Sequence, residues 1–177
     1  MGATPVEIAL LMISPPVMNG LQMGNIDWAV LLGATLPVSS GLWLLVIKPH
    51  LSMIPTALQC ARVLRIGWTE YLLVVGPVAI SLALAWMLRL WNPVIRLHFT
   101  WSQDVWPWGA PFGIWLAWLA WKRDDMRLAL AASPFLSPYL AFHSWSLALV
   151  GLIGRRRTLI IAVLGLWGII ILRVCVR

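Results

Sequence analysis

Long uncharged runs are the feature that most limits what this chain can fold into. Residues 71–88 read YLLVVGPVAISLALAWML, and residues 128–154 contain 27 positions without Lys, Arg, Asp or Glu. A helix that crosses a bilayer needs about 20 consecutive, mostly apolar residues. Because 61% of the 177 residues are hydrophobic and only 11% are charged, the sequence predicts an all-α integral membrane protein with about four to six transmembrane or re-entrant helices.

The chain is expected to form a single multi-pass membrane domain over residues 1–177. Proline, glycine and serine interrupt several apolar runs, and irregular backbone persists at membrane depth only where protein or a water-filled cavity satisfies its polar groups. The predicted segments are a short helix and polar turn (8–25), a broken span (26–47), an amphipathic interfacial helix (50–65), spans at 69–91 and 105–121, a proline-broken span or re-entrant hairpin (126–153) and a final span (157–174).

Basic residues stand in short clusters at the ends of the apolar runs, around Lys48, Lys122 and Arg155. This pattern is typical of membrane topology and lipid headgroup contact, so membrane lipids and other membrane chains are the expected partners. Nucleic-acid binding, which the net charge of +7 could suggest, is not expected, because the cations do not form a groove that follows phosphates.

The distribution of charge across the membrane depends on residues 126–153. If each long run crosses once, eight basic residues share one side and five the other; if this segment re-enters, the division becomes nine against four. Both divisions place the Lys48 and Lys122 clusters together, and the more basic side is expected to be cytoplasmic.

Four polar side chains, Asn19, Gln22, Asn25 and Asp27, separate two apolar stretches near the N-terminus. In one interpretation Asp27 only caps the helix that follows, because a short acceptor side chain satisfies free N–H groups there. In the other, these side chains join Lys48 and His50 in a polar cleft, because ionisable groups beside membrane segments tend to face a cavity or a partner.

Two further candidates, Tyr139 and His143, are four residues apart and would share one face of a helix. His143 is expected either to bond to a neighbouring helix or to contribute to the cleft. The full set of lipid-phosphate or polar-cleft candidates is Gln22, Asn25, Asp27, Lys48, His50, Tyr139 and His143.

No Ser-His-Asp set, paired-carboxylate site, metal-ligand spacing or phosphate-binding loop is recognisable in the sequence. Cys60 and Cys175 lie in different segments and are expected to be buried or interfacial thiols. The tryptophans at 115, 118 and 121 recur every third residue, which predicts a packing or lipid-facing surface. The expectation is therefore no catalytic residue, no metal and no cofactor other than a possible bound lipid.

Three strings, SPPVMNGLQMGNIDWAVLLG, LLVIKPHLSMIP and AASPFLSPYLAFHSWSLALVGL, resemble in that order the membrane region of polyprenol-phosphate-sugar-dependent glycosyltransferases. The resemblance is to the GT-C superfamily, especially glycosyltransferase family 87, which includes bacterial mannosyltransferases. The matching features are GN before a helix, KP after one and the SP and SPY breaks, over roughly residues 8–153.

This resemblance implies a helical membrane fold of a bacterial inner membrane, with a cleft that holds a lipid-linked sugar phosphate such as a polyprenyl phosphate. It places the opening polar stretch along this cleft and Lys48 and His50 near the lipid phosphate. Members of the family use an acidic residue in an early extracytoplasmic loop as the catalytic base, and Asp27 does not match that motif. The chain thus resembles the C-terminal part of such an enzyme without its catalytic part.

Two functions remain after this comparison. In the first, the chain is a non-catalytic accessory subunit that packs, through its tryptophan-rich surfaces, in a larger membrane assembly. In the second, it is the lipid-binding half of a split glycosyltransferase whose general base resides in a separate chain. The first function is favoured because the chain lacks a match to the family's acidic residue, and without a general base it could not carry out the transfer by itself.

Overall fold

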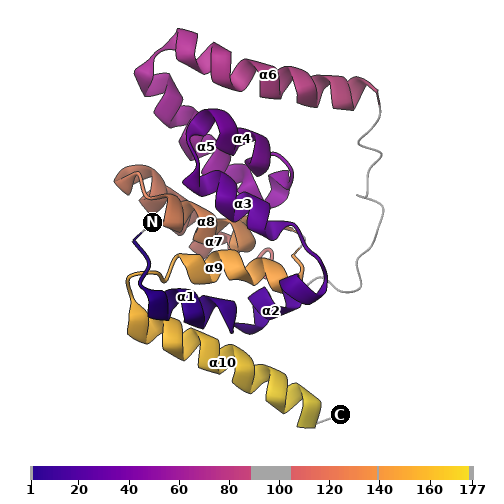
Figure 1. Cartoon of the computed structure of the whole chain (residues 1–177), viewed down its shortest axis with the longest axis vertical. Helices are drawn as coiled ribbons and strands as arrows, with labels where there is room; N and C mark the ends of the chain where they lie inside the picture. The colour runs from indigo at the N-terminus through magenta and orange to yellow at the C-terminus, as the bar shows by residue number, and fades with distance from the viewer. Residues whose placement is uncertain (1, 89–104, 139, 176–177) are drawn as a thin grey trace.

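The computed structural model describes residues 2–88, 105–138 and 140–175, and all regular structure within these ranges is helical. This confirms the predicted all-α class for the described residues (Figure 1). In chain order the elements are α1 (Pro5–Met12), α2 (Pro15–Gln22), α3 (Asp27–Thr35), α4 (Val38–Leu45), α5 (Pro49–Ile66), α6 (Trp68–Met87), α7 (Ala110–Arg123), α8 (Met126–Leu136), the 3-10 helix η2 (Phe142–Trp145), α9 (Ser146–Val150) and α10 (Arg156–Cys175).

The first helices show how proline and capping residues divide the N-terminal apolar stretch. Thr4 caps α1 in a capping box with Glu7, and Pro5 occupies the first helical position, where the missing N–H costs nothing. Pro15 and Pro16 then begin α2, after α1 has ended at Met12. The paired prolines therefore mark the boundary between two short helices.

Helices α3 and α4 pack directly on each other and are separated by Leu36 and Pro37. Two glycines allow the close approach: a Cβ on Gly41 would lie 2.3 Å from the carbonyl oxygen of Gly33. Gln59 of α5 donates a hydrogen bond of 3.1 Å from Nε2 to that same Gly33 oxygen. The interruption of the apolar run 26–47 thus lies at the proline, and small residues hold its two helices together.

Helix α5 is more buried than an interfacial helix would be. It packs against α4, α6 and α8, and its buried side chains include Leu51, Leu58 and Gln59. The main hydrophobic core joins Leu51 and Leu58 to leucines and valines of α3, α4, α8 and α9. The centre of the molecule is therefore formed by short or proline-containing helices.

Helices α7 and α8 form a hairpin whose turn is Asp124 and Asp125. Asp124 adopts a left-handed conformation (φ 52°), and Asp125 caps α8 by accepting the N–H of Arg127 at 2.9 Å. A Cβ on Gly113 of α7 would lie within 3.0 Å of three side-chain atoms of α8. The aromatic rings of Phe112, Phe135 and Trp145 pack edge to face in succession and link this hairpin to η2.

Residues 126–153, which follow α7, leave one end of the molecule and return to the same end. After α8, the chain turns through η2 and comes back along α9, which packs against α8. Arg127 Nη1, at the start of α8, donates to the carbonyl oxygen of Ile153 at 3.4 Å. The two ends of residues 126–153 therefore lie side by side.

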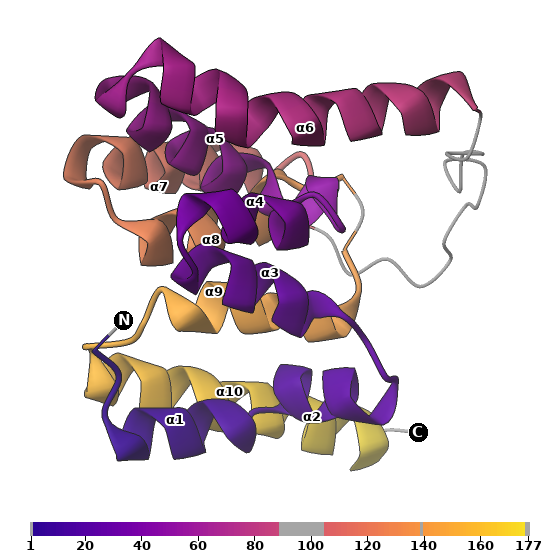
Figure 2. The same ribbon diagram turned by 45° about the horizontal axis from the view of Figure 1, so that its top comes forward.

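Two outer helices differ from the rest of the molecule. Helices α6 and α10 each contain twenty residues and are long and apolar enough to cross a membrane. Only Val78 of α6 and two residues of α10, Leu159 and Val163, are buried. Of the four to six predicted membrane helices, two thus meet this criterion within the described residues, and both lie on the outside of the fold (Figure 2).

Helix α10 packs on the N-terminal helices through apolar side chains, and two polar contacts join the same parts of the chain. The Glu7 side chain, 2% exposed, accepts the backbone N–H of Gly154 at 2.6 Å, and Trp167 Nε1 donates to the Ile13 carbonyl at 3.1 Å. Gly154 has φ +88°, a conformation that favours glycine. Glycine therefore makes the sharp turn between α9 and α10 that brings its N–H to Glu7.

The predicted thiols and tryptophan surface lie at different depths. Cys60 is partly buried, whereas Cys175 is exposed at the end of α10. Trp115, Trp118 and Trp121 are each about half exposed, and Lys122 lies over the ring of Trp118. The stripe on α7 thus faces outward.

Candidate functional site: a buried polar cluster

The cluster begins in the turn between α2 and α3. Gly24, at φ +60°, redirects the chain after α2, and the Asn25 N–H bonds to the Gly20 carbonyl at 2.9 Å. Asn25 Oδ1 then accepts the backbone N–H of Asp27 at 3.0 Å. A short amide side chain that bonds two residues onward is typical of Asn in turns.

Asp27 does not act as a helix cap, as one interpretation of the sequence suggested. The N-cap of α3 is Ile26, which makes no side-chain capping bond, and Asp27 is the first helical residue. The Asp27 side chain is only 8% exposed and points toward other elements. Its carboxylate is thus available for contacts between distant parts of the chain.

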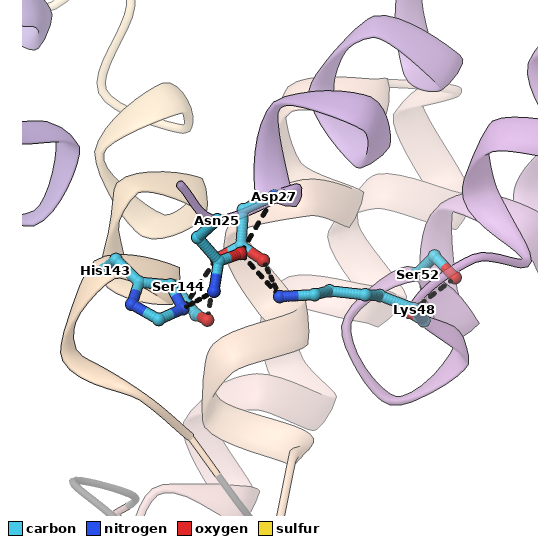
Figure 3. A network of polar contacts seen from close by, with 6 residues as sticks. All are labelled: Asn25, Asp27, Lys48, Ser52, His143 and Ser144. Atoms are coloured by element: carbon cyan, nitrogen blue, oxygen red, sulfur yellow. Dashed lines mark hydrogen bonds and ion pairs between the residues drawn. The ribbon is translucent and has the colours of Figure 1, made fainter. Parts of the chain in front are cut away.

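Lys48 reaches this carboxylate from the junction of α4 and α5. Its Nζ lies 2.5 Å from Asp27 Oδ1 and 2.6 Å from Asn25 Oδ1, and its side chain is 17% exposed. Pro49 begins α5 directly after Lys48, and Ser52 Oγ donates to the Lys48 carbonyl at 3.0 Å. The helix start therefore fixes the backbone from which Lys48 extends (Figure 3).

The third contribution comes from η2, more than a hundred residues later in the chain. Ser144 Oγ donates to Asp27 Oδ2 at 2.8 Å, and His143 Nε2 lies 3.6 Å from the same oxygen. Asn25 Nδ2 contacts His143 Nε2. Figure 3 shows the Asp27 carboxylate between Lys48 on one side and His143 with Ser144 on the other.

The hydrogen bonds fix the roles of the amide and the imidazole. Asn25 Oδ1 accepts from both Lys48 and Asp27, so its Nδ2 must be the group that faces His143. An amide nitrogen only donates, which makes His143 Nε2 the acceptor and the ring neutral. Protonation of Nε2 would remove this bond and direct a positive charge toward Asp27 instead.

Of the seven candidates from the sequence, four meet in this cluster: Asn25, Asp27, Lys48 and His143. Gln22 is exposed at the end of α2 and is not among the hydrogen-bonding partners of the cluster. Tyr139 lies outside the described residues.

His50, the remaining candidate, stands two residues after Lys48 and keeps an exposed side chain. Its pKa lies below the usual value because neighbouring atoms partly exclude water from the ring and Lys48 adds positive charge; Asp27 acts in the opposite direction. The neutral ring is therefore favoured near neutral pH, and His50 lies within electrostatic reach of the cluster.

Sequence reasoning missed two serines. Ser144 supplies a hydrogen bond to Asp27, and Ser52 supports the Lys48 backbone. Ser144 directly follows His143, so a search of the neighbours of each candidate for small hydroxyl side chains would have included it. Nothing local to Ser52 distinguishes it from other serines.

The chemistry open to the cluster follows from how its groups are used. Both oxygens of Asp27 are engaged, one by the Lys48 ammonium and one by the Ser144 hydroxyl, and the ion pair places opposite charges side by side. Within the part of the chain that the structure describes, no group of three or more His, Cys, Asp or Glu side chains is placed to hold a metal ion. The arrangement favours holding distant segments together or contacting an anion through Lys48.

No protein-family model, curated protein or solved structure matched the chain. The resemblance to polyprenol-phosphate-sugar-dependent glycosyltransferases therefore stays a prediction from the sequence, carried by the three strings quoted above.

Proposed function

We propose that the chain is a non-catalytic, multi-pass membrane subunit that packs in a larger membrane assembly. The observation that carries this proposal is the apolar helix α6, of whose twenty residues only Val78 is covered by the rest of the chain. A buried helix of a soluble protein would be covered by its own core, and a large uncovered apolar surface would be unfavourable in water. Lipid or neighbouring membrane helices would remove this cost.

The proposed membrane domain contains four to six spanning or re-entrant segments. In addition to α6 and α10, these are the broken segment that contains α3 and α4, the segment that contains α7, and the proline-broken segment that contains α8 and α9. Broken helices are compatible with membrane depth where protein satisfies the freed backbone groups.

The cluster around Asp27 supports a structural role within this subunit. It joins the α2–α3 turn, the start of α5 and η2 through contacts to both oxygens of the Asp27 carboxylate. Exposed tryptophans on α7 and the uncovered faces of α6 and α10 offer several surfaces to neighbouring chains. Aromatic side chains are enriched where protein surfaces pack together.

A native mass spectrum of the particle extracted from its native membrane in mild detergent tests this proposal. We expect a stoichiometric complex in which this chain accompanies other membrane proteins. A chain that stays a lone monomer over a series of mild detergents would contradict the assembly role, and a chain released from membranes by alkaline carbonate would contradict the membrane location itself.

A second function is favoured by one specific observation. The three strings that carry the resemblance each contribute to the same cluster: Asn25 and Asp27 from the first, Lys48 from the second and His143 with Ser144 from the third. On the basis of this convergence we infer a second possible function, in which the chain is the lipid-binding half of a split glycosyltransferase. In that function Lys48 contacts the phosphate of a polyprenyl phosphate.

Binding of polyprenyl phosphate to the purified chain and to a reconstituted pair with its partner separates the two functions. For the second function, His50→Ala and Lys48→Ala are expected to weaken binding, whereas Arg62→Ala, which removes a cation far along α5, should leave it unchanged. Lys48→Arg retains the charge and serves as the folding control. Equal binding by all four variants would count against the second function.

A further inference from the structure

One end of the molecule gathers most of the charged side chains that the structure describes. An ion pair and two hydrogen bonds connect three turns there. Arg62 of α5 bonds to Asp124 in the α7–α8 turn at 2.8 Å, Arg127 reaches the carbonyl of Ile153, and Gly154 bonds to Glu7. The ends of α5, α7 and α9 and the starts of α6, α8 and α10 are thereby close together.

This basic end, defined by Arg62, Arg65, Lys122, Arg123, Arg127 and Arg155–157, contains eight of the ten basic residues in the described ranges. Its acidic residues are Glu7, Glu70, Asp124 and Asp125, which leaves a net charge of +4. The remaining charged residues of the described chain are Asp27, Lys48 and Arg173. Among the described residues, the charge is therefore strongly asymmetric from one end of the fold to the other.

Lys48, which is close to Arg62 and Arg65 in the sequence, does not belong to the basic end. Lys48 stands at the N-terminus of α5 and Arg62 lies 14 residues later in the same helix, a separation of about 21 Å at 1.5 Å per residue. Lys48 is engaged with Asp27, away from the basic end. An interfacial helix over residues 50–65, as the sequence predicts, would place both ends of α5 at one membrane surface.

Helices α6 and α10 both start at the basic end. Trp68 follows Arg65 by three residues, and Arg156 directly follows Arg155, so each apolar helix begins beside a group of cations. Both views show the two helices running toward the same opposite end of the molecule (Figures 1 and 2). Meanwhile residues 126–153 leave this end and return to it.

We propose that the basic end lies among the anionic phospholipid headgroups of the cytoplasmic leaflet, and that α6 and α10 both enter the membrane from that side. This inference rests on the proposed membrane location of the chain. Lys and Arg near the ends of membrane helices favour the cytoplasmic face, and each such charge is attracted to anionic lipid. Arg155–157 are exposed, which leaves their guanidinium groups accessible to phosphate oxygens.

Thiol labelling in bacterial cells that express the full chain tests the orientation. The variants Thr69→Cys, at the start of α6, and Thr158→Cys, at the start of α10, are made without the native thiols, by Cys60→Ala and Cys175→Ala. Cys60→Ala alone retains native Cys175 at the far end of α10. All three probed positions are exposed.

We expect a membrane-impermeant maleimide added to intact cells to label Cys175, and to label the two engineered thiols only after permeabilisation. Labelling of either engineered thiol from outside, or protection of Cys175, would overturn the orientation. Release of the chain by alkaline carbonate would instead show that the membrane location had failed, so the two failures are distinguishable.

A lipid titration followed by native mass spectrometry tests the headgroup partner. The purified chain is titrated with phosphatidylglycerol and with phosphatidylcholine, and Arg155→Gln/Arg156→Gln/Arg157→Gln is compared with Arg173→Gln at the other end of α10. We expect the triple substitution to weaken phosphatidylglycerol binding by about tenfold or more, since each surface cation contributes roughly fivefold. Arg173→Gln should not change it; an equal loss in both variants, or no loss in either, would overturn the assignment.

Discussion

Two aspartates in this molecule form ion pairs with basic side chains, one pair in a mostly buried environment and the other in a more exposed one. Asp27 and Lys48 meet at 2.5 Å with side chains that are 8% and 17% exposed, and Asn25, Ser144 and His143 surround them. Asp124 and Arg62 meet at 2.8 Å with side chains that are 44% and 31% exposed. Arg65 adds a second, weaker contact to Asp124 at 3.9 Å.

The difference between the pairs shows why the distance between two charges does not by itself determine how much an ion pair contributes to stability. An exposed pair exchanges water contacts for a salt bridge of little net value, typically about 0–1 kcal/mol. A buried pair has lost its water, so removing one partner leaves a charge that nothing else solvates, at a cost of about 3–5 kcal/mol. We therefore expect loss of the Asp27 pair to lower the free energy of unfolding strongly, and loss of the Asp124 pair to change it little.

The largest effect is expected for Lys48→Met, which leaves the buried Asp27 carboxylate without its cation. We expect the free energy of unfolding to fall by about 3–5 kcal/mol, measured by denaturant titration of the full chain in mild detergent. The double variant Asp27→Leu/Lys48→Met carries no uncompensated charge and should be closer to wild type than either single variant. A Lys48→Met variant as stable as wild type would contradict the larger contribution to stability expected of the buried pair.

An intermediate effect is expected for Ser144→Ala. This change removes the hydroxyl that donates to Asp27 Oδ2 and leaves the ion pair in place. Hydrogen bonds to charged groups contribute about 1.5–3 kcal/mol, so the loss should lie below that of Lys48→Met in the same titration. Ser81→Ala, on the exposed face of α6, is the matched control; an equal response of the two serines would contradict a role of Ser144 in the cluster.

A small effect is expected for Arg62→Gln. The Asp124 pair is well hydrated, and Asp124 keeps its contact with Arg65, so the free energy of unfolding should change by less than about 1 kcal/mol. Raising the salt concentration should reduce the effect further, because mobile ions screen exposed charges. If Arg62→Gln lowered the free energy of unfolding as much as Lys48→Met does, exposure to solvent would not explain the difference between the two pairs.

A local, acid-dependent effect is expected at Glu7, a carboxylate held by N–H groups instead of a cation. The backbone N–H groups of Thr4 and Gly154 keep the pKa of Glu7 below its usual value of 4.5. A carboxyl with a lowered folded pKa contributes stability above the unfolded pKa and loses it as pH falls through the folded value. Acidification below pH 4.5 should therefore weaken the contact between α1 and the α9–α10 turn.

Comparing the unfolding midpoints of wild type and Glu7→Gln across this pH range isolates that contribution. The wild type should lose its advantage over the variant as pH falls below 4.5, because only the wild-type side chain titrates. Parallel pH profiles would show that Glu7 does not hold the turn through its charge.

Much of the secondary structure could be predicted from the sequence because its signals are local. The apolar runs predicted the regions of α6 and α10, and Pro37 lies at the interruption of the predicted broken span. Polar residues in apolar surroundings are costly, which made Asn25, Asp27, Lys48 and His143 visible as candidates. Their types and positions were enough to select them.

Their partners could not be predicted because these depend on contacts between distant residues. Asp27 could have capped its own helix, and only the packing of η2 and the start of α5 against the α2–α3 turn directs its carboxylate elsewhere. Glu7 was not selected at all, since its contact with Gly154 spans 147 positions. Ser144 became significant for the same reason.

By itself, the sequence determined the class of the protein: a helical chain with apolar segments suited to a membrane and with cations at their ends. These properties follow from hydrophobicity and helix-breaking residues, which act over a few turns of backbone. The tertiary structure alone decided that Lys48 lies away from the other cations and pairs with Asp27, and that residues 126–153 return to their starting end. Burial and charge pairing are properties of neighbours in space, and the folded chain sets those neighbours.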